Sequence, residues 1–317
     1  MFIADCRLRI ADCRVERPAR PRKGCRRLAG RACGELCHEF EKVHPDDRAA
    51  AHQYNRSVTV SQRVNAERLA LLGWGRAVLM QLAHPLVAAG IAEHSSFRGG
   101  PAANVKRLHS TIRAMLDLSF GSPEDIRRAV GHINAIHDRV HGTLREAAGR
   151  FSAGTPYSAS DPELLIWVDA TVRDSMLLAY ELFVAPLTPV DRDRFWAEGE
   201  DIMTALRVPS GARIQSPDHF RRYLDELETN GSLAVTTEAR ALAREIVSPP
   251  GTRALWPLAR LHRVTTVGLL PARIREAYGF AWSDADDRAL GRWARPIKRA
   301  RRLMPDAIAI WPRARVY

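Results

Sequence analysis

The chain has 317 residues, 46% of them hydrophobic, and a formal net charge of +12 at pH 7 that comes almost entirely from arginine. This apolar fraction is typical of a globular protein with a substantial core. No run reaches about 18 consecutive apolar residues, so we expect no membrane-spanning helix. The basic charge is compatible with nucleic acid, an anionic membrane or a GC-rich genome, but no nucleic-acid-binding motif is present, and we expect no nucleic-acid partner.

The N-terminal leader differs from the rest of the chain in composition. All five cysteines lie in its first 37 residues, and the segment Ile3–Arg7 is repeated at Ile10–Arg14. We expect residues 1–45 to be disordered or to follow a misplaced start codon, although Cys33, Cys37 and His38 leave a metal site open there. The chain after the leader has no cysteine, which suits a reducing compartment, so we expect a cytoplasmic protein.

From Asn55 onward, apolar residues recur with helical spacing, and Pro85 interrupts the first long stretch. No convincing period-two alternation indicates a strand. The sequence therefore predicts a single all-α domain over residues 50–317. The predicted helices cover residues 64–83, 86–94, 104–118, 122–150, 160–183, 190–206, 216–228 and 236–246, with two or three more between 254 and 303.

His137 occupies an unusual position in the predicted helix Ser122–Arg150. Apolar residues form one stripe along this helix, and His137 falls near its middle. The stripe residues are Ile126, Val130, Ile133, Val140 and Leu144. A buried imidazole needs a partner, which is either a hydrogen-bonding group in the core or a metal ion. His141 follows at i+4, so the two histidines form a candidate metal-binding pair on one helix.

Two further groups of polar residues are candidates for a site. Arg107 and Thr111 lie at i and i+4 on the predicted helix 104–118, with Thr111 bordering its apolar stripe. Glu93 and His94 end the apolar segment after Pro85, where they either line a pocket or cap the helix end.

Several segments are similar to one known family. The run Gly75–Gly90, followed by Glu93–Phe97, resembles the MpaB-like oxygenases, which include the latex clearing proteins, or rubber oxygenases. Ile136–Gly142, Tyr157–Val168 and Leu270–Gly279 add supporting matches, and the resemblance covers roughly residues 55–310.

The resemblance implies an all-α fold that holds one b-type haem, with His137 as the iron ligand. It also places Arg107 and Thr111 in a distal motif, where Ser110 replaces the family's lysine, and makes His141 the counterpart of a proximal arginine. Glu93 matches a distal acid, and His94 lies beside it. The resemblance thus implies an oxygenase that acts with dioxygen, and an unidentified electron donor, on a lipophilic substrate such as an isoprenoid or alkene.

Two other functions remain open from the residues alone. One is a non-haem metal enzyme that uses His137 and His141 with Glu93 or His94. The other is a cofactor-free helical protein that contacts an anionic membrane through the basic stretch Arg288–Arg315, in which Asp306 is the only acid.

Overall fold

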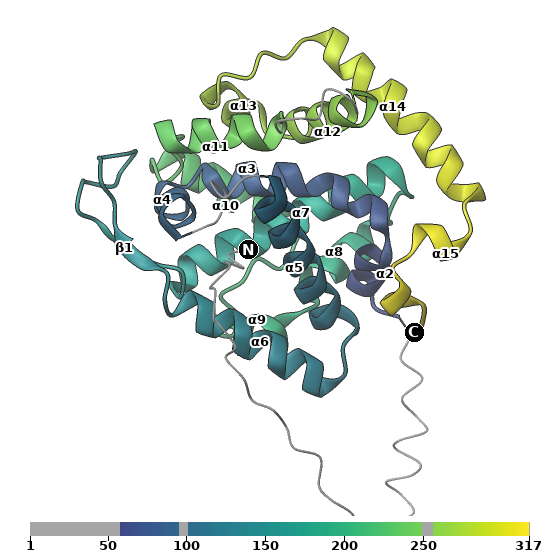
Figure 1. Cartoon of the computed structure of the whole chain (residues 1–317), viewed down its shortest axis with the longest axis horizontal. Helices are drawn as coiled ribbons and strands as arrows, with labels where there is room; N and C mark the ends of the chain where they lie inside the picture. Colours follow the sequence, from purple (N-terminus) through teal and green to yellow (C-terminus); the bar gives the residue numbers. More distant parts are fainter. Residues whose placement is uncertain (1–57, 95–100, 249–255, 317) are drawn as a thin grey trace, which may run out of the picture. The chain divides into compact units, whose positions relative to one another are not determined.

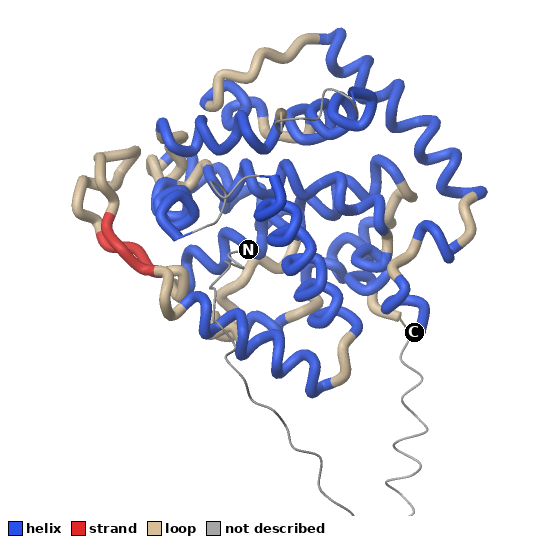
Figure 2. Tube along the Cα trace, viewed as in Figure 1, coloured by secondary structure: helices blue, strands red, loops and turns tan. Residues whose placement is uncertain are grey.

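The computed structural model describes residues 58–94, 101–248 and 256–316, and the leader and the predictions for it lie outside these residues. Almost all regular structure in these residues is helical (Figures 1 and 2). The helices are α2 (Val60–Ala66), the 3₁₀ helix η1 (Arg68–Gly73), α3 (Trp74–Leu82), α4 (Pro85–His94), α5 (Pro101–Phe120), α6 (Pro123–His137), α7 (Pro162–Phe183), α8 (Pro189–Ala197), α9 (Glu200–Ala205), α10 (Pro217–Thr229), α11 (Thr237–Val247), α12 (Trp256–Gly268), α13 (Ala272–Ala277), α14 (Asp284–Leu303), α15 (Asp306–Ala309) and the 3₁₀ helix η4 (Pro312–Val316).

A short hairpin corrects the all-α prediction to a mostly helical fold. Strands β1 (His141–Thr143) and β2 (Pro156–Ser158) pair antiparallel, with Gly142 opposite Tyr157. Figure 2 shows this hairpin at one edge of the helices, with its long connecting loop extending beyond it. The prediction of one helix over residues 122–150 is therefore wrong, because helix α6 ends at His137 and the hairpin follows.

Most predicted helix starts are confirmed, and their local chemistry explains them. Ser122, Asp161, Ser216 and Thr236 each accept a hydrogen bond from a backbone N–H of the first helical turn. Such caps satisfy amide groups that have no partner inside the helix. The predicted helix 190–206 is instead two helices, α8 and α9, separated at Gly199, whose φ of +91° favours glycine.

Helix α7 lies in the core, and its buried residues include Trp167, Ala170, Ser175 and Phe183. The 3₁₀ helix η1 packs so closely on it that a Cβ atom at Gly73 would lie 2.2 Å from the Ser175 carbonyl oxygen. Helix–helix contact at this distance requires glycine, because any larger residue would force the backbones apart.

Arg76, on helix α3, connects three parts of this core. Its guanidinium is 3% exposed, pairs with Asp174 at 2.6 Å, and donates to Ser175 Oγ and the Leu269 carbonyl, both also at 2.6 Å. A buried charge with an ion partner and two further acceptors avoids the large penalty of an unpaired buried cation. This cluster fixes α3 against α7 and against the end of α12.

Within the residues that the structure describes, no single helix is long and apolar enough to cross a membrane. One bent pair, Arg68–Leu82 with Pro85–His94, passes that test by length and composition, with a bend of 108° at the predicted Pro85 break. Most of α3 and α4 is buried inside the protein.

Candidate active site

His137 is the last residue of helix α6, and its side chain is 4% exposed. Val130 and Ile133 are buried on the same helix, as the apolar stripe predicts, and Ile136, which the stripe did not include, is buried as well. Val140 and Leu144 are also buried, although they follow the helix. Four of the five predicted stripe residues are therefore buried, and Ile126 is half-buried. The chain changes from helix to hairpin between Ile133 and Leu144.

Burial controls the protonation of His137. Removal from water lowers the pKa of the imidazole from 6.5 to about 4, an effect opposed by nearby Asp138 and reinforced by Arg207. A ring with this pKa is neutral at physiological pH, which is the form that coordinates metal ions. His137 thus satisfies the chemical requirement for an iron ligand.

The end of helix α6 is held by an ion pair and two hydrogen bonds. Asp138 pairs with both terminal nitrogens of Arg207 and accepts a hydrogen bond from Ser160 Oγ at 3.2 Å. Asn134 donates to the Ala205 carbonyl at 3.0 Å. Arg207 adopts a φ of +71°, a left-handed conformation that is rare for residues other than glycine. These contacts fix the backbone on both sides of His137.

Helix α5 packs against α6 and carries the predicted distal motif. Thr111 is 8% exposed and belongs to the buried side of α5, whereas Ser110 is exposed. The side chain of Arg107 lies outside the described part of the chain.

Glu93, at the end of helix α4, forms a second cluster with the hairpin. Tyr157 Oη donates to Glu93 Oε2, and Arg145 Nε donates to Oε1 at 2.8 Å. The hydrogen bond from Tyr157 lowers the pKa of the Glu93 carboxyl, and Arg145 and His94 lower it further. Glu93 is therefore anionic at neutral pH. Burial and the neighbouring carboxylate raise the pKa of Tyr157, which stays a hydrogen-bond donor.

Backbone geometry at the hairpin leaves room for this cluster. A Cβ atom at Gly142 would lie 2.6 Å from Tyr157 Oη and 3.1 Å from Glu93 Oε2, so only glycine fits at that position. His94 Nε2 donates to the His141 carbonyl oxygen at 3.1 Å. The structure thus brings Glu93 and His94 to the β1 strand of His141.

The prediction that His137 and His141 lie on one helix is wrong. His137 is buried at the end of α6, whereas His141 is exposed on strand β1. The i, i+4 spacing places two side chains on the same face only where the helix continues, and here the turn after His137 ends it. Among the described residues, no group of three or more His, Cys, Asp or Glu side chains is arranged to hold a metal ion.

The residues that sequence reasoning missed in this region are Tyr157, Arg145, Asp138 and Arg207. Tyr157 and Asp138 both lie in segments that resemble the family, Tyr157–Val168 and Ile136–Gly142, and this resemblance was the available signal. The other contacts join residues 52 to 69 positions apart in the chain, and no local pattern reports them.

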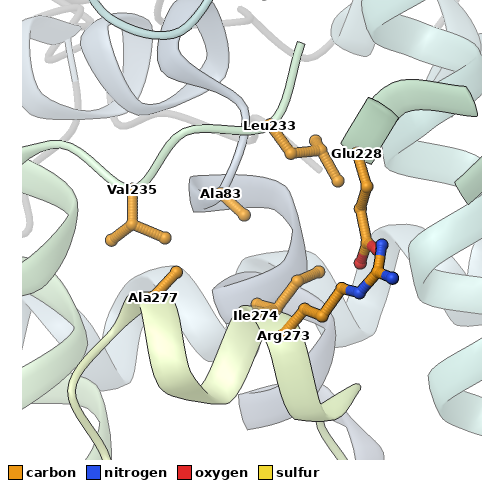
Figure 3. Close-up of a pocket in the computed structure, with 7 residues that line it drawn as sticks. All are labelled: Ala83, Glu228, Leu233, Val235, Arg273, Ile274 and Ala277. Atoms are coloured by element: carbon orange, nitrogen blue, oxygen red, sulfur yellow. The ribbon is translucent and has the colours of Figure 1, made fainter. Parts of the chain in front are cut away.

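A small pocket of about 190 Å³ lies away from all of these residues (Figure 3). Its walls are mainly apolar, and Arg273 and Glu228 form an ion pair of 3.2 Å at one side. The lining residues are Ala83, Glu228, Leu233, Val235, Arg273, Ile274 and Ala277. None of the site residues predicted from the sequence lines it.

Comparison with known proteins gives one family. A model described as "ER-bound oxygenase mpaB/B'/Rubber oxygenase, catalytic domain" matches residues 61–299. Two uncharacterized proteins, from Mycobacterium bovis and Mycobacterium tuberculosis, are each 26% identical over 237 residues, covering 72% of this chain and 87% of the relative. No solved structure shows significant similarity to the chain. The chain belongs to the mpaB and rubber oxygenase catalytic-domain family, and this membership implies oxygenase activity.

Proposed function

We propose that this protein is a haem b-dependent oxygenase in which His137 is the iron ligand. The observation that carries the proposal is the burial of the neutral His137 imidazole at the end of helix α6. The backbone before and after this residue is held by contacts with other parts of the protein. One buried histidine suits a haem, because the porphyrin itself would supply the remaining nitrogen ligands of the iron. The bound iron would supply the redox chemistry that activates dioxygen.

The residues of the chain have separate tasks in this proposal. The contacts of Asp138 and Asn134 orient the backbone that carries His137, and position the imidazole for the iron. Arg107 and Thr111 on the adjacent helix α5 are the candidates for contacts to the haem or to oxygen. His94 and His141 stay secondary candidates for contacts to the haem.

Glu93 is proposed to act as a fixed negative charge beside the substrate. Tyr157 and Arg145 occupy both of its oxygens, which keeps the carboxylate in one orientation and ionised. A carboxyl group with a lowered pKa is a weak proton acceptor, so stabilisation of developing positive charge suits it better than proton transfer.

The proposed substrate is a lipophilic molecule with a carbon–carbon double bond, such as an isoprenoid. Support comes from the family, which includes rubber oxygenases, and from helix α4, whose Leu86, Val87 and Ile91 form an apolar segment leading to Glu93. Dioxygen is the proposed co-substrate. An electron donor is required if the reaction is a monooxygenation.

The test uses the full-length protein, with haem measured by absorption and by the pyridine haemochrome method. We expect about one haem b per chain in the wild type, and loss of the Soret band in His137→Ala. His84→Ala is the matched control, because His84 is also buried and its pKa is also lowered to about 4 by burial, yet it is not a proposed ligand. This control should keep its haem.

A second variant separates ligation from folding. His137→Gly leaves a space at the ligand position, so added imidazole should restore the Soret band if the histidine binds iron. A wild-type protein that stays colourless after reconstitution with haem would overturn the haem proposal. Full haem content in His137→Ala would instead remove His137 from the role of ligand.

A further inference from the structure

Five arginines form a single stripe along helix α14. Arg288, Arg292, Arg295, Arg299 and Arg302 follow spacings of four, three, four and three residues, and all five are exposed. These spacings place the side chains within one narrow face over about 21 Å of helix length. Figure 1 shows α14 running along the outside of the helices, beyond α12. We call these five residues the arginine stripe.

The opposite face of α14 is occupied by contacts within the protein. Ala289 and Ala294 are buried, Lys298 donates to the Glu181 carbonyl at 2.6 Å, and Arg301 pairs with Glu67 at 2.6 Å. The basic residues of α14 therefore fall into two groups, one facing inward with partners and one facing outward.

No residue in the described part of the chain pairs with the stripe. None of its five guanidinium groups forms an ion pair or hydrogen bond there. Successive arginines at i, i+3 and i, i+4 repel each other, which destabilises the helix unless an external anion compensates. The acids of α14 are confined to its first turn, at Asp284, Asp286 and Asp287.

Apolar residues mark the end of the stripe. Leu303 is 87% exposed and Ile308, on helix α15, is 58% exposed, and Leu303 is the most exposed of the large apolar side chains that the structure describes. Exposed leucine and isoleucine gain free energy by entering the acyl region of a bilayer, while a sugar–phosphate backbone offers them no apolar surface.

We propose that the arginine stripe and its apolar end bind the surface of a membrane rich in anionic phospholipid, with α14 parallel to that surface. The guanidinium groups contact lipid phosphates, because a row of forked donors matches a plane of phosphate groups. Leu303 and Ile308 enter the interface beside them. This inference does not depend on the haem proposal.

The experiment is vesicle sedimentation with the full chain in about 0.1 M salt. Vesicles of phosphatidylglycerol and phosphatidylcholine should bind the wild type, and vesicles of phosphatidylcholine alone should not. The variant Arg292→Gln, Arg295→Gln, Arg299→Gln should bind on the order of 100-fold more weakly, since each arginine near an anionic surface contributes about fivefold.

The matched control removes the same charge elsewhere. Arg127, Arg222 and Arg244 are exposed on α6, α10 and α11 and have no ion partner in the described part of the chain. Their triple replacement by glutamine should keep binding within about threefold of the wild type. An equal loss in both triple variants would overturn the proposal, because net charge alone would then explain the binding.

A third variant distinguishes lipid from nucleic acid. Leu303→Ser with Ile308→Ser should weaken vesicle binding and leave binding of a duplex DNA probe unchanged. If the wild type binds duplex DNA more tightly than the anionic vesicles, and the stripe variant loses that binding, the surface belongs to nucleic acid and the membrane proposal fails. Equal binding to neutral and anionic vesicles would also overturn it.

Discussion

The environments of His137 and Glu93 both lower a pKa, but with opposite effects on charge, since at neutral pH His137 is uncharged and Glu93 is anionic. Burial removes the positive charge of His137, because the imidazolium loses its hydration. Hydrogen bonds preserve the negative charge of Glu93, because Tyr157 and Arg145 stabilise the carboxylate. The two sites are therefore sensitive to different changes. Greater access of solvent should raise the pKa of His137, whereas loss of a hydrogen-bond donor should raise the pKa of Glu93.

The largest effect is expected for stability at acid pH in the haem-free protein. Below pH 6.5 an unfolded histidine gains a proton, while folded His137 and His84, each with a pKa of about 4, stay neutral. Each histidine should therefore cost about 1.4 kcal/mol of stability per pH unit, or about 3 kcal/mol by pH 4, and nothing above pH 6.5. Urea unfolding between pH 7 and 5 measures this slope.

Single replacements measure how much of this pH dependence of stability each histidine contributes. His137→Gln and His84→Gln should each reduce the dependence on pH by about half. A wild-type slope near zero would show that neither imidazole is held neutral, and the contrast with Glu93 would disappear.

The next effect concerns catalysis. Replacing Glu93 by Gln removes the fixed charge at nearly constant shape, so turnover should fall on the order of 100-fold. The haem content should not change, because the proposed iron ligand is elsewhere. Haem loss in Glu93→Gln would instead connect the two sites that we describe as separate.

A smaller effect is expected from Tyr157→Phe, which deletes one hydrogen bond to Glu93. Without this donor the pKa of Glu93 should rise, so the acid limb of the activity–pH profile should move to higher pH. Turnover at neutral pH should fall about tenfold. An unchanged profile would mean that the ionisation of Glu93 does not limit the reaction.

The smallest effect is expected from Arg207→Lys. Lysine keeps the charge but replaces the two-nitrogen contact with Asp138 by a single one. Because this pair is exposed, transfer of haem from the protein to apomyoglobin should become faster by only about threefold. A much larger acceleration would show that Arg207 acts on His137 through more than the backbone of α6.

Local sequence signals predicted most of the helices, because their starts depend on neighbouring residues. Ser122 and Asp161 cap helices α6 and α7 where the sequence placed them. The hairpin was missed for a physical reason. Val140 and Leu144 are buried on the helical stripe although they lie outside the helix, so their hydrophobicity could not reveal the change.

The site was predictable only in part. His137 was identified as a buried polar residue by its position in an apolar stripe, and the structure buries it. The clamp around Glu93 depends on the hairpin that brings Tyr157 and Arg145 to the end of α4, and this placement is tertiary. The roles proposed for Arg107, Thr111 and His94 stay predictions.

The segment between His137 and Tyr157 constrains where insertions and deletions can occur in homologues of this protein. One continuous stretch begins at the proposed iron ligand and ends at the donor that holds Glu93, with Gly142 between them. An insertion or deletion in strand β1 would displace both His137 and Tyr157. One in the outer loop, at Arg145 and beyond, could leave His137 in place. Homologues should therefore vary in the length of the outer loop before they vary between residues 137 and 143.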